Sequence, residues 1–400
     1  MDVLTETIVV PQLRFNEFEG EWEKNELKPI ATKLNVGFVG TCEKFYTCCD
    51  NGVKLIRTGN LVDGKITEKN LKYVTNEFHS ANKKSQIIKN DILIARHGSN
   101  GQACLYNSTE VANSLNIVIV RIDGNQANTK YIMNYMNSPF VKRQVLSKTA
   151  GSTQGVINTK EIAKLKLHLP SLPEQKKIAT FLSTVDEKLQ QLKRKKDLLE
   201  EYKKGVMQKI FCQDLRFRDE NGNHYPDWEE KQLGDVFVYK NGGSFEKDVV
   251  EQGNYFLITL NSIDIEGNLK SDHKKINITD SSLDRGDLIM VLSDVAHGNF
   301  LGLTAIIPND NKYVLNQRMG ALKIKTNDNI RFLNQFINYH QKYFKLHGQG
   351  SSQQNLSKGD ILKFIINIPS LLEQQKIANF LSTMDSKVEL VNTQLEKTEA

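Results

Sequence analysis

One phrase occurs twice in the 400-residue sequence, and this repeat restricts the possible fold more than any other feature. The stretch LPSLPEQKKIATFLSTVDEKL begins at Leu169, and IPSLLEQQKIANFLSTMDSKV begins at Ile368. Between 170–188 and 369–387, 14 of 19 positions are identical without a gap. A period of 199 residues is too long for a solenoid, so the sequence predicts two homologous domains.

Shorter matches extend the repeat on the upstream side of this phrase. A GSTQ stretch at 151–154 aligns with GSSQ at 350–353, and LRF at 13–15 aligns with LRF at 215–217. The two copies agree at their ends, which indicates a common scaffold. They differ in the middle, which indicates two different recognition surfaces, although drift of a surface layer without a function would give the same pattern.

The two variable middles both have the pattern of mixed α/β structure. Apolar runs predict strands at 117–122 and 321–325. Amphipathic spacing predicts helices at 131–146 and 331–344. We therefore expect each copy to contain a small α/β domain.

A long helix is predicted to follow the repeated phrase. Between Glu174 and Phe211 there is no proline and Gly205 is the only glycine, so an unbroken helix would measure about 57 Å. Apolar residues in both copies follow the three- and four-residue spacing of a coiled-coil seam, and such a stripe must be buried. The predicted helix-pairing residues are Leu182, Val185, Leu189, Leu192, Leu199 and Val206 in the first copy, and Leu381, Met384, Val388, Val391 and Leu395 in the second.

The expected fold class is α+β, with two homologous α/β domains separated by two long antiparallel coiled-coil helices and related by an approximate twofold axis. The second helix is expected to be shorter, because Ala400 aligns with Glu201 and the counterpart of the last turns is missing or supplied by another protein. The predicted divisions are 1–168 for the first domain, 169–211 for the first helix, 212–367 for the second domain and 368–400 for the second helix.

Several predicted loops carry side chains of the types that read base edges in DNA. Arg pairs with guanine, and Asn or Gln with adenine, through two hydrogen bonds each. The small residues of GSTQ and GSSQ allow a backbone to approach a phosphate, and a tight connection with a capping hydroxyl is the alternative. The candidate DNA-binding residues are Arg57, Arg96, His97, Ser99, Asn100, Gln102, Ser152, Thr153 and Gln154 in the first copy, and His297, Asn299, Gln317, Arg318, Ser351, Ser352 and Gln353 in the second.

Composition adds weaker restrictions. The formal net charge of +6 slightly favours polyanionic partners such as nucleic acid. The five cysteines have no spacing typical of zinc sites, so free thiols in a reducing compartment are expected. No signal peptide and no membrane-spanning run is predicted, and we expect a cytoplasmic protein.

Two fragments resemble catalytic motifs but lack essential parts. Asn137-Ser138-Pro139-Phe140 differs from the Asn-Pro-Pro-Phe/Tyr motif of adenine methyltransferases at its second position, and no glycine-rich cofactor loop accompanies it. In Pro226-Asp227-Trp228-Glu229 the spacing is too short for the PD…(D/E)xK nuclease arrangement. The sequence therefore predicts no catalytic, cofactor-binding or metal-binding residues in this chain.

The two copies of PSL(P/L)EQ(K/Q)KIA.FLS..D, each preceded by a GS[ST]Q stretch and a variable region, resemble the specificity subunit of type I restriction–modification systems. The resemblance covers essentially the whole chain. It implies that each variable region is a target recognition domain, and that the helices beginning at Glu174 and Glu373 form the spacer between them.

The resemblance also implies the partners. The subunit would recognise a split, asymmetric sequence in double-stranded DNA and dock two methyltransferase subunits, which carry S-adenosylmethionine and modify adenine. Motor–nuclease subunits would join for cleavage. This chain itself would hold no cofactor and would not be an enzyme.

Two other functions compete with this interpretation. A coiled-coil scaffold that brings proteins together without binding DNA would explain the long helices and the modest charge. An autonomous nuclease or methyltransferase is disfavoured by the incomplete motifs. Salt-dependent binding to DNA separates the specificity subunit from the scaffold, because phosphate contacts lose affinity steeply as salt rises.

Overall fold

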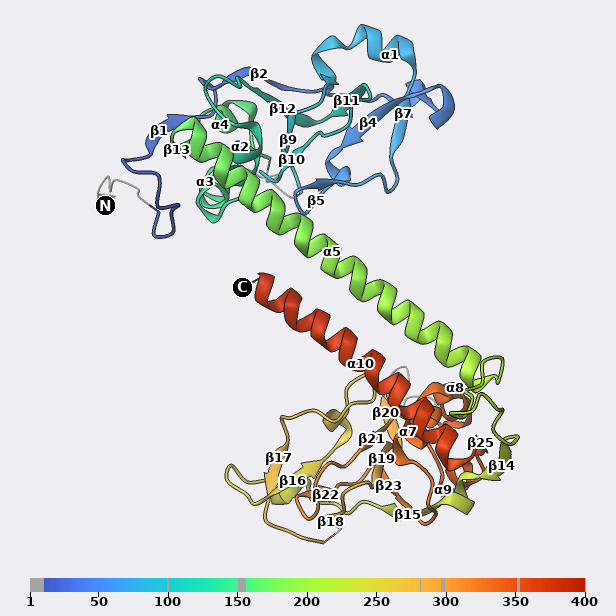
Figure 1. Ribbon diagram of the computed structural model, residues 1–400. Coiled ribbons are helices and arrows are strands. Elements are labelled where there is room, and N and C mark those ends of the chain that lie inside the picture. The colour runs from blue at the N-terminus through green and yellow to red at the C-terminus, as the bar shows by residue number, and fades with distance from the viewer. Residues whose placement is uncertain are drawn as a thin grey trace. The chain divides into compact units, whose positions relative to one another are not determined.

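The computed structural model describes residues 11–98, 101–149, 156–280, 282–295, 299–350 and 353–399 (Figure 1). The chain divides into two compact units, Met1–Lys188 (unit 1) and Leu189–Ala400 (unit 2). In the described ranges no helix is both long enough and apolar enough to cross a membrane.

Unit 1 contains two main sheets. One is antiparallel, with strand order β10-β9-β12-β2, and the other has order β3-β7-β4-β11-β8 and includes one parallel pair, β4 and β11. Two short pairs, β1-β13 and β5-β6, complete it. The strands are β1 Glu23–Glu26, β2 Ala31–Val36, β3 Tyr46–Thr47, β4 Val53–Arg57, β5 Leu61–Val62, β6 Lys65–Ile66, β7 Lys72–Val74, β8 Gln86–Ile87, β9 Ile92–Ala95, β10 Ala103–Leu105, β11 Ala112–Leu115, β12 Ile117–Ile122 and β13 Lys166–Leu169, and the helices are α1 Asn76–Ala81, α2 Thr129–Met136, α3 Pro139–Thr149 and α4 Thr159–Ala163.

Unit 2 has the same arrangement of strands. Its antiparallel sheet has order β15-β23-β19-β21, and its second sheet has order β17-β16-β22-β18 with β16 and β22 parallel. The strands are β14 Glu229–Gln232, β15 Phe237–Asn241, β16 Tyr255–Ile258, β17 Lys274–Ile276, β18 Ser282–Leu283, β19 Leu288–Val291, β20 Ser293–Val295, β21 Thr304–Ile306, β22 Tyr313–Leu315, β23 Met319–Ile324, β24 Gln353–Asn355 and β25 Ile365–Ile368, and the helices are α6 Leu233–Val236, α7 Ile330–Tyr339, α8 Gln341–His347, α9 Lys358–Leu362 and α10 Leu371–Glu399.

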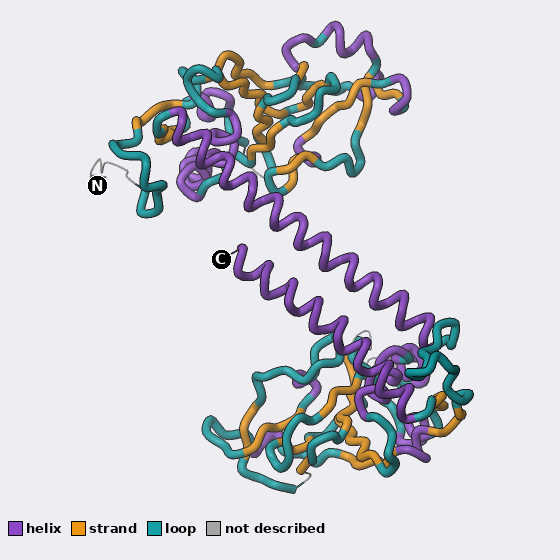
Figure 2. The backbone as a smooth tube through the Cα atoms, viewed as in Figure 1, coloured by secondary structure: helices purple, strands orange, loops and turns teal. Residues whose placement is uncertain are grey.

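The two units therefore share one topology despite their different middles. Strands β2, β12, β9 and β10 of unit 1 correspond in order to β15, β23, β19 and β21 of unit 2, and β7, β4, β11 and β8 correspond to β17, β16, β22 and β18. The predicted pair of homologous α/β domains is confirmed. Figure 2 shows the mixture of strands and helices in each unit.

Each predicted domain helix is divided in two. The apolar pattern over 131–146 belongs to α2 and α3, which are separated at Asn137 and Ser138. The pattern over 331–344 belongs to α7 and α8, which are separated at His340. Periodicity alone does not detect such breaks, because the apolar face continues across them.

The long helix α5 runs from Leu172 to Phe211, and its last part belongs to unit 2 together with α10. Lys193 lies 2.9 Å from Glu399, and Lys203 forms a second ion pair with Asp385. Residues later in α5 thus pair with residues earlier in α10, so the two helices are antiparallel within unit 2 (Figure 1).

The predicted helix-pairing residues differ in burial. In unit 2, five of them are buried: Leu192, Val206, Leu381, Met384 and Val391. Leu189, Leu199, Val388 and Leu395 are half-buried. In unit 1, Val185 is half-buried and Leu182 is 36% exposed.

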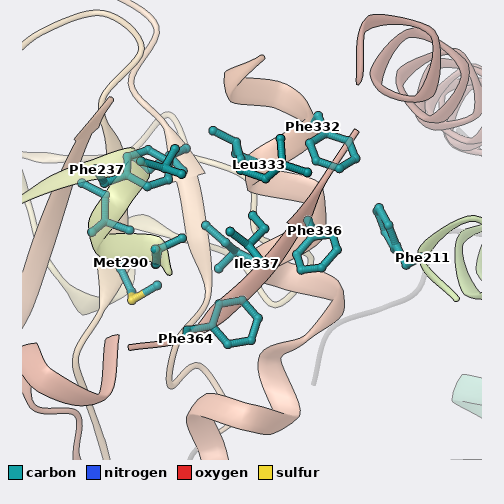
Figure 3. Packing of buried hydrophobic residues seen from close by; sticks show 14 of the residues in the cluster. Phe211, Phe237, Met290, Phe332, Leu333, Phe336, Ile337 and Phe364 are labelled. Atoms are coloured by element: carbon teal, nitrogen blue, oxygen red, sulfur yellow. The ribbon is translucent and has the colours of Figure 1, made fainter. Parts of the chain in front are cut away.

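The largest apolar cluster of unit 2 joins the end of α5 to the domain. Phe211 packs against Phe332 and Phe336 of α7, with ring centroids 6.2 and 5.2 Å apart (Figure 3). The same cluster includes Val206 and Leu381, one from each long helix. Burial of these side chains fixes the start of α10 and the end of α5 on the same domain core.

Candidate nucleic-acid interface

In each unit, the loops that carry the candidate residues leave the sheets at one edge. The parallel strands β4 and β11 end side by side, because Arg57 is opposite Leu115. The end of β9 lies beside the start of β12, because Ala95 is opposite Ile117. Since a single residue, Asn116, connects β11 to β12, the loops after β4, β9 and β11 are neighbours.

In unit 1, the predicted residues Arg96 and His97 contact neighbouring loops. The Thr58 hydroxyl lies 3.4 Å from Nε2 of the exposed His97. The N–H of Ile157 donates to the carbonyl of Arg96 at 2.9 Å, which ties the segment after GSTQ to the loop after β9. The predicted residues Ser99, Asn100, Ser152, Thr153 and Gln154 lie outside the described residues.

Besides His97, three predicted side chains of unit 1 have partners inside the protein. The Arg96 Nε donates to the carbonyl of Ile157 at 3.4 Å. The Arg57 guanidinium donates to the carbonyl of Asn70 at 2.8 Å. With its amide oxygen turned toward β5-β6, Gln102 accepts from the N–H groups of Gly64 and Asp63 at 2.9 and 2.5 Å. Gln102 therefore holds the turn of the β5-β6 hairpin, and Arg57 holds the segment between β6 and β7.

In unit 2 the corresponding loops also meet. Strand β24 begins at the last residue of the GSSQ stretch and pairs with β20, and the Gln353 amide donates to the Ser293 hydroxyl at 2.5 Å. The N–H of Leu292 donates to the carbonyl of Arg318 at 3.0 Å. Asn299, Gln317 and Arg318 are exposed, and the predicted residues His297, Ser351 and Ser352 lie outside the described residues.

The repeated phrase has a structural explanation that the sequence did not reveal. In unit 1, Glu174 accepts from the Arg14 guanidinium at 2.8 and 2.7 Å. In unit 2, Glu373 accepts from Arg216 at 3.0 and 2.8 Å. We call these two contacts the Arg–Glu clamps. Each joins the arginine of an LRF stretch to the first turn of a long helix, so the two repeated stretches are two sides of one contact.

The glutamine after each of these glutamates makes a second duplicated contact. Gln175 accepts from the N–H of Asn128 at 2.8 Å and donates to the carbonyl of Pro170. Gln374 accepts from the N–H of Asn329 at 2.7 Å and donates to Pro369. Asn128 and Asn329 are the N-cap residues of α2 and α7. The Glu-Gln pair therefore connects each long helix to its own domain.

Asn137, the first residue of the methyltransferase-like fragment, is also structural. Its amide accepts from the N–H of Ala103 at 3.0 Å and donates to the carbonyl of the same residue at 2.8 Å. Asn338 makes the same pair of bonds to Thr304 in unit 2. Each asparagine thus satisfies an edge position of strand β10 or β21, which accounts for its recurrence at the end of α2 and in the last turn of α7.

Within the described ranges, no three His, Cys, Asp or Glu side chains are grouped as metal ligands would be. The five cysteines are free thiols, and burial raises the pKa of Cys104 to about 12, which keeps that thiol protonated at neutral pH.

His168 is a buried titratable group on strand β13 of unit 1. Its Nδ1 lies 2.8 Å from the Tyr135 hydroxyl, and its carbonyl accepts from Tyr131. Burial lowers the pKa of His168, and the charge of Lys24 on the neighbouring strand lowers it further. Burial also raises the pKa of Tyr135 to about 12. The folded state therefore favours neutral imidazole beside a protonated phenol.

Because the folded state holds His168 neutral, its contribution to stability is present above the ordinary histidine pKa and is lost as pH falls through that value. The aligned residue in unit 2 is Asn367. As pH is lowered from 7.5 to 5.5, we expect the free energy of unfolding, measured by chemical denaturation, to fall less in His168→Asn than in the parent. His273 and His340 also have pKa values lowered by burial, so the comparison of the two proteins isolates His168. Parallel pH curves would show that His168 is not responsible.

Comparison with known proteins agrees with this architecture. The family model for the type I restriction modification DNA specificity domain matches residues 19–201 and 225–400. The chain belongs to this family. The two matched segments correspond to the two copies found in the sequence.

The individual relatives have low sequence identity to this chain. The chain is 25% identical over 415 aligned residues to a Methanocaldococcus jannaschii protein assigned as the type I restriction enzyme MjaX specificity subunit, covering 96% of this chain and 91% of that protein. It is 24% identical to the type I restriction enzyme MjaVIII specificity subunit of the same organism, covering 80% of this chain and 77% of that protein.

Solved structures share the fold at low identity. The crystal structure of the type I restriction-modification S subunit from M. genitalium has a TM-score of 0.62 and 16% identity, covering 98% of this chain and 96% of that one. A chain from a structure of a type I R-M system has a TM-score of 0.55 and 14% identity, covering 94% and 93%. At these identities the likeness shows the fold alone.

Proposed function

We propose that each unit of this chain reads one half of a bipartite, asymmetric DNA site within a type I restriction–modification complex. The observation that carries the proposal is the combination of one shared topology with two different sets of edge loops. A common scaffold with different loops is what two recognition modules need when they bind the same polymer in the same way but read different bases.

The residue types on these loops support contact with DNA. In unit 1 the loops present Arg96 and His97, and in unit 2 they present Asn299, Gln317 and Arg318. Guanidinium and amide groups make the two-point hydrogen bonds that distinguish bases in the major groove. The net charge of +6 supplies a modest general attraction to phosphates.

The long helices set the spacing between the half-sites and dock two methyltransferase subunits in this proposal. The Arg–Glu clamps support it, because each fixes the start of a long helix to its own domain. The methyltransferase subunits would bind S-adenosylmethionine and modify adenine, and motor–nuclease subunits would join for cleavage. This chain would supply no catalytic group.

The proposal is tested by co-expression with the cognate methyltransferase subunit, followed by sequencing of methylated adenines. One bipartite motif, with affinity for its duplex that falls steeply as salt rises, is the expected result. A complex that forms but neither binds DNA nor methylates a defined motif would contradict the proposal and favour a protein scaffold.

A further inference from the structure

The turn between β22 and β23 in unit 2 is longer than its counterpart in unit 1. In unit 1 only Asn116 separates the two strands, whereas unit 2 has Asn316, Gln317 and Arg318. The flanking residues are buried, but Gln317 and Arg318 are exposed. A short turn between core strands therefore exposes two polar side chains on the surface of unit 2.

Arg318 has an unusual backbone conformation, with φ at +67°. Among the described residues, the non-glycine residues with positive φ are Asp63, Asn70, Asn90, Asn116, Gln213, Asn311 and Arg318. Asp and Asn tolerate this region, and Gln213 lies just after the end of α5, where its N–H donates to Ile210. Arg318 has neither explanation, and its side chain makes no hydrogen bond or ion pair with a described residue.

The surrounding backbone holds this turn in place. The carbonyl of Arg318 accepts from Leu292 at 3.0 Å, and the N–H of Met319 donates to Asn316 at 3.3 Å. Gly242 crosses so close to the turn that an added Cβ would lie 1.9 Å from the carbonyl oxygen of Asn316. Because the turn has little room to move, the surrounding backbone holds Arg318 in its strained conformation.

The turn also lies where the candidate loops of unit 2 meet. Leu292, which contacts Arg318, begins the segment that contains Asn299. The carbonyl of Leu292 accepts from Leu356, which directly follows β24. An exposed arginine, whose side chain has no hydrogen-bond partner among the described residues, thus lies beside the candidate loops of unit 2.

We propose that Arg318 determines one base of the half-site read by unit 2, by donating to O6 and N7 of a guanine in the major groove. This inference rests on the proposed function and names the residue that carries one position of its specificity. The planar guanidinium fork matches the two guanine acceptors. A fixed backbone reduces the ordering cost of the contact, which gives a reason for a strained arginine at this turn.

Arg318→Gly tests the proposal in the complete complex, because glycine removes the side chain and relieves the positive φ. We expect the variant to fold and methylate, with discrimination against other bases at one guanine reduced on the order of tenfold to a hundredfold. Methylated adenines would be sequenced, and binding would be compared on duplexes with single-base changes. Arg318→Lys keeps the charge without the fork and should lose discrimination at the same position.

Arg285→Ala is the matched control. Arg285 is also exposed and lies before β19, at the opposite end of that strand from Leu292, so the same loss of charge should leave the motif unchanged. An unchanged motif in Arg318→Gly, or a uniform loss of affinity for all sequences, overturns the inference while the proposed function stands. A parent complex without any bipartite motif overturns both.

Discussion

Replacing Glu373 with alanine is expected to lower the free energy of unfolding of unit 2 by about 3 to 5 kcal/mol. The Glu373 side chain is fully buried and accepts from Arg216 and from Nε1 of Trp228 at 3.2 Å. Without the carboxylate, the indole N–H loses its acceptor. The mostly buried guanidinium of Arg216 loses its buried counter-charge and keeps only backbone carbonyls and the exposed carboxylate of Asp227, 3.8 Å away.

Chemical denaturation of the full chain measures this effect. Glu389→Ala removes an exposed glutamate from the same helix, and its expected change is within about 0.5 kcal/mol. Glu373→Gln keeps the shape and one acceptor but not the charge, so it should fall between the two. Equal stabilities of Glu373→Ala and Glu389→Ala would refute the clamp as a stabilising contact.

Leu381→Ala is expected to cost about 2 to 5 kcal/mol, because it opens a cavity in the cluster that joins the two long helices in unit 2. Leu381 is fully buried and belongs to the same cluster as Val206 and Ile210 of α5. The cost depends on how far these neighbours can close around the missing side chain.

The first copy supplies the matched control for this change. Leu182 occupies the aligned position and is 36% exposed, so Leu182→Ala should cost much less. Thermal and chemical unfolding of both variants gives the comparison. If the two substitutions lower the free energy of unfolding equally, the packing of Leu381 between α10 and the end of α5 is not a stabilising contact.

The duplicated architecture could be predicted from sequence because two signals have a fixed relation to structure. A long gap-free repeat requires two related domains, and three- and four-residue apolar spacing requires a helix with a buried stripe. The two related domains are confirmed by the shared strand order, and the long helices by the antiparallel α5 and α10. The order of strands within each sheet did not follow from sequence, because it depends on pairing between distant segments.

The Arg–Glu clamps could not be found by local patterns. Arg14 and Glu174 are 160 residues apart, and no periodicity connects them. The signal that was available is the recurrence of LRF and PSL.EQ together in both copies. A repeated arginine and a repeated glutamate, each beside apolar residues, are the expected trace of one duplicated ion pair.

The candidate DNA-binding residues are predicted from residue type, which does not reveal what a side chain contacts in the fold. Gln102 has the chemistry to read adenine, but its amide is satisfied by backbone groups of the β5-β6 hairpin. Arg318 also has a side chain that can read a base, and it is exposed without such a partner among the described residues. The difference arises from loops that approach each other in three dimensions, which sequence spacing does not encode.

Exchange of residues 1–168 for the corresponding region of another specificity subunit tests the central claim most directly. The exchanged chain would be expressed with the cognate methyltransferase subunit, and methylated adenines would be mapped by sequencing. The account predicts that one half of the motif changes, while the other half and the spacing between them are retained. A motif in which both halves change, or in which neither does, would contradict it.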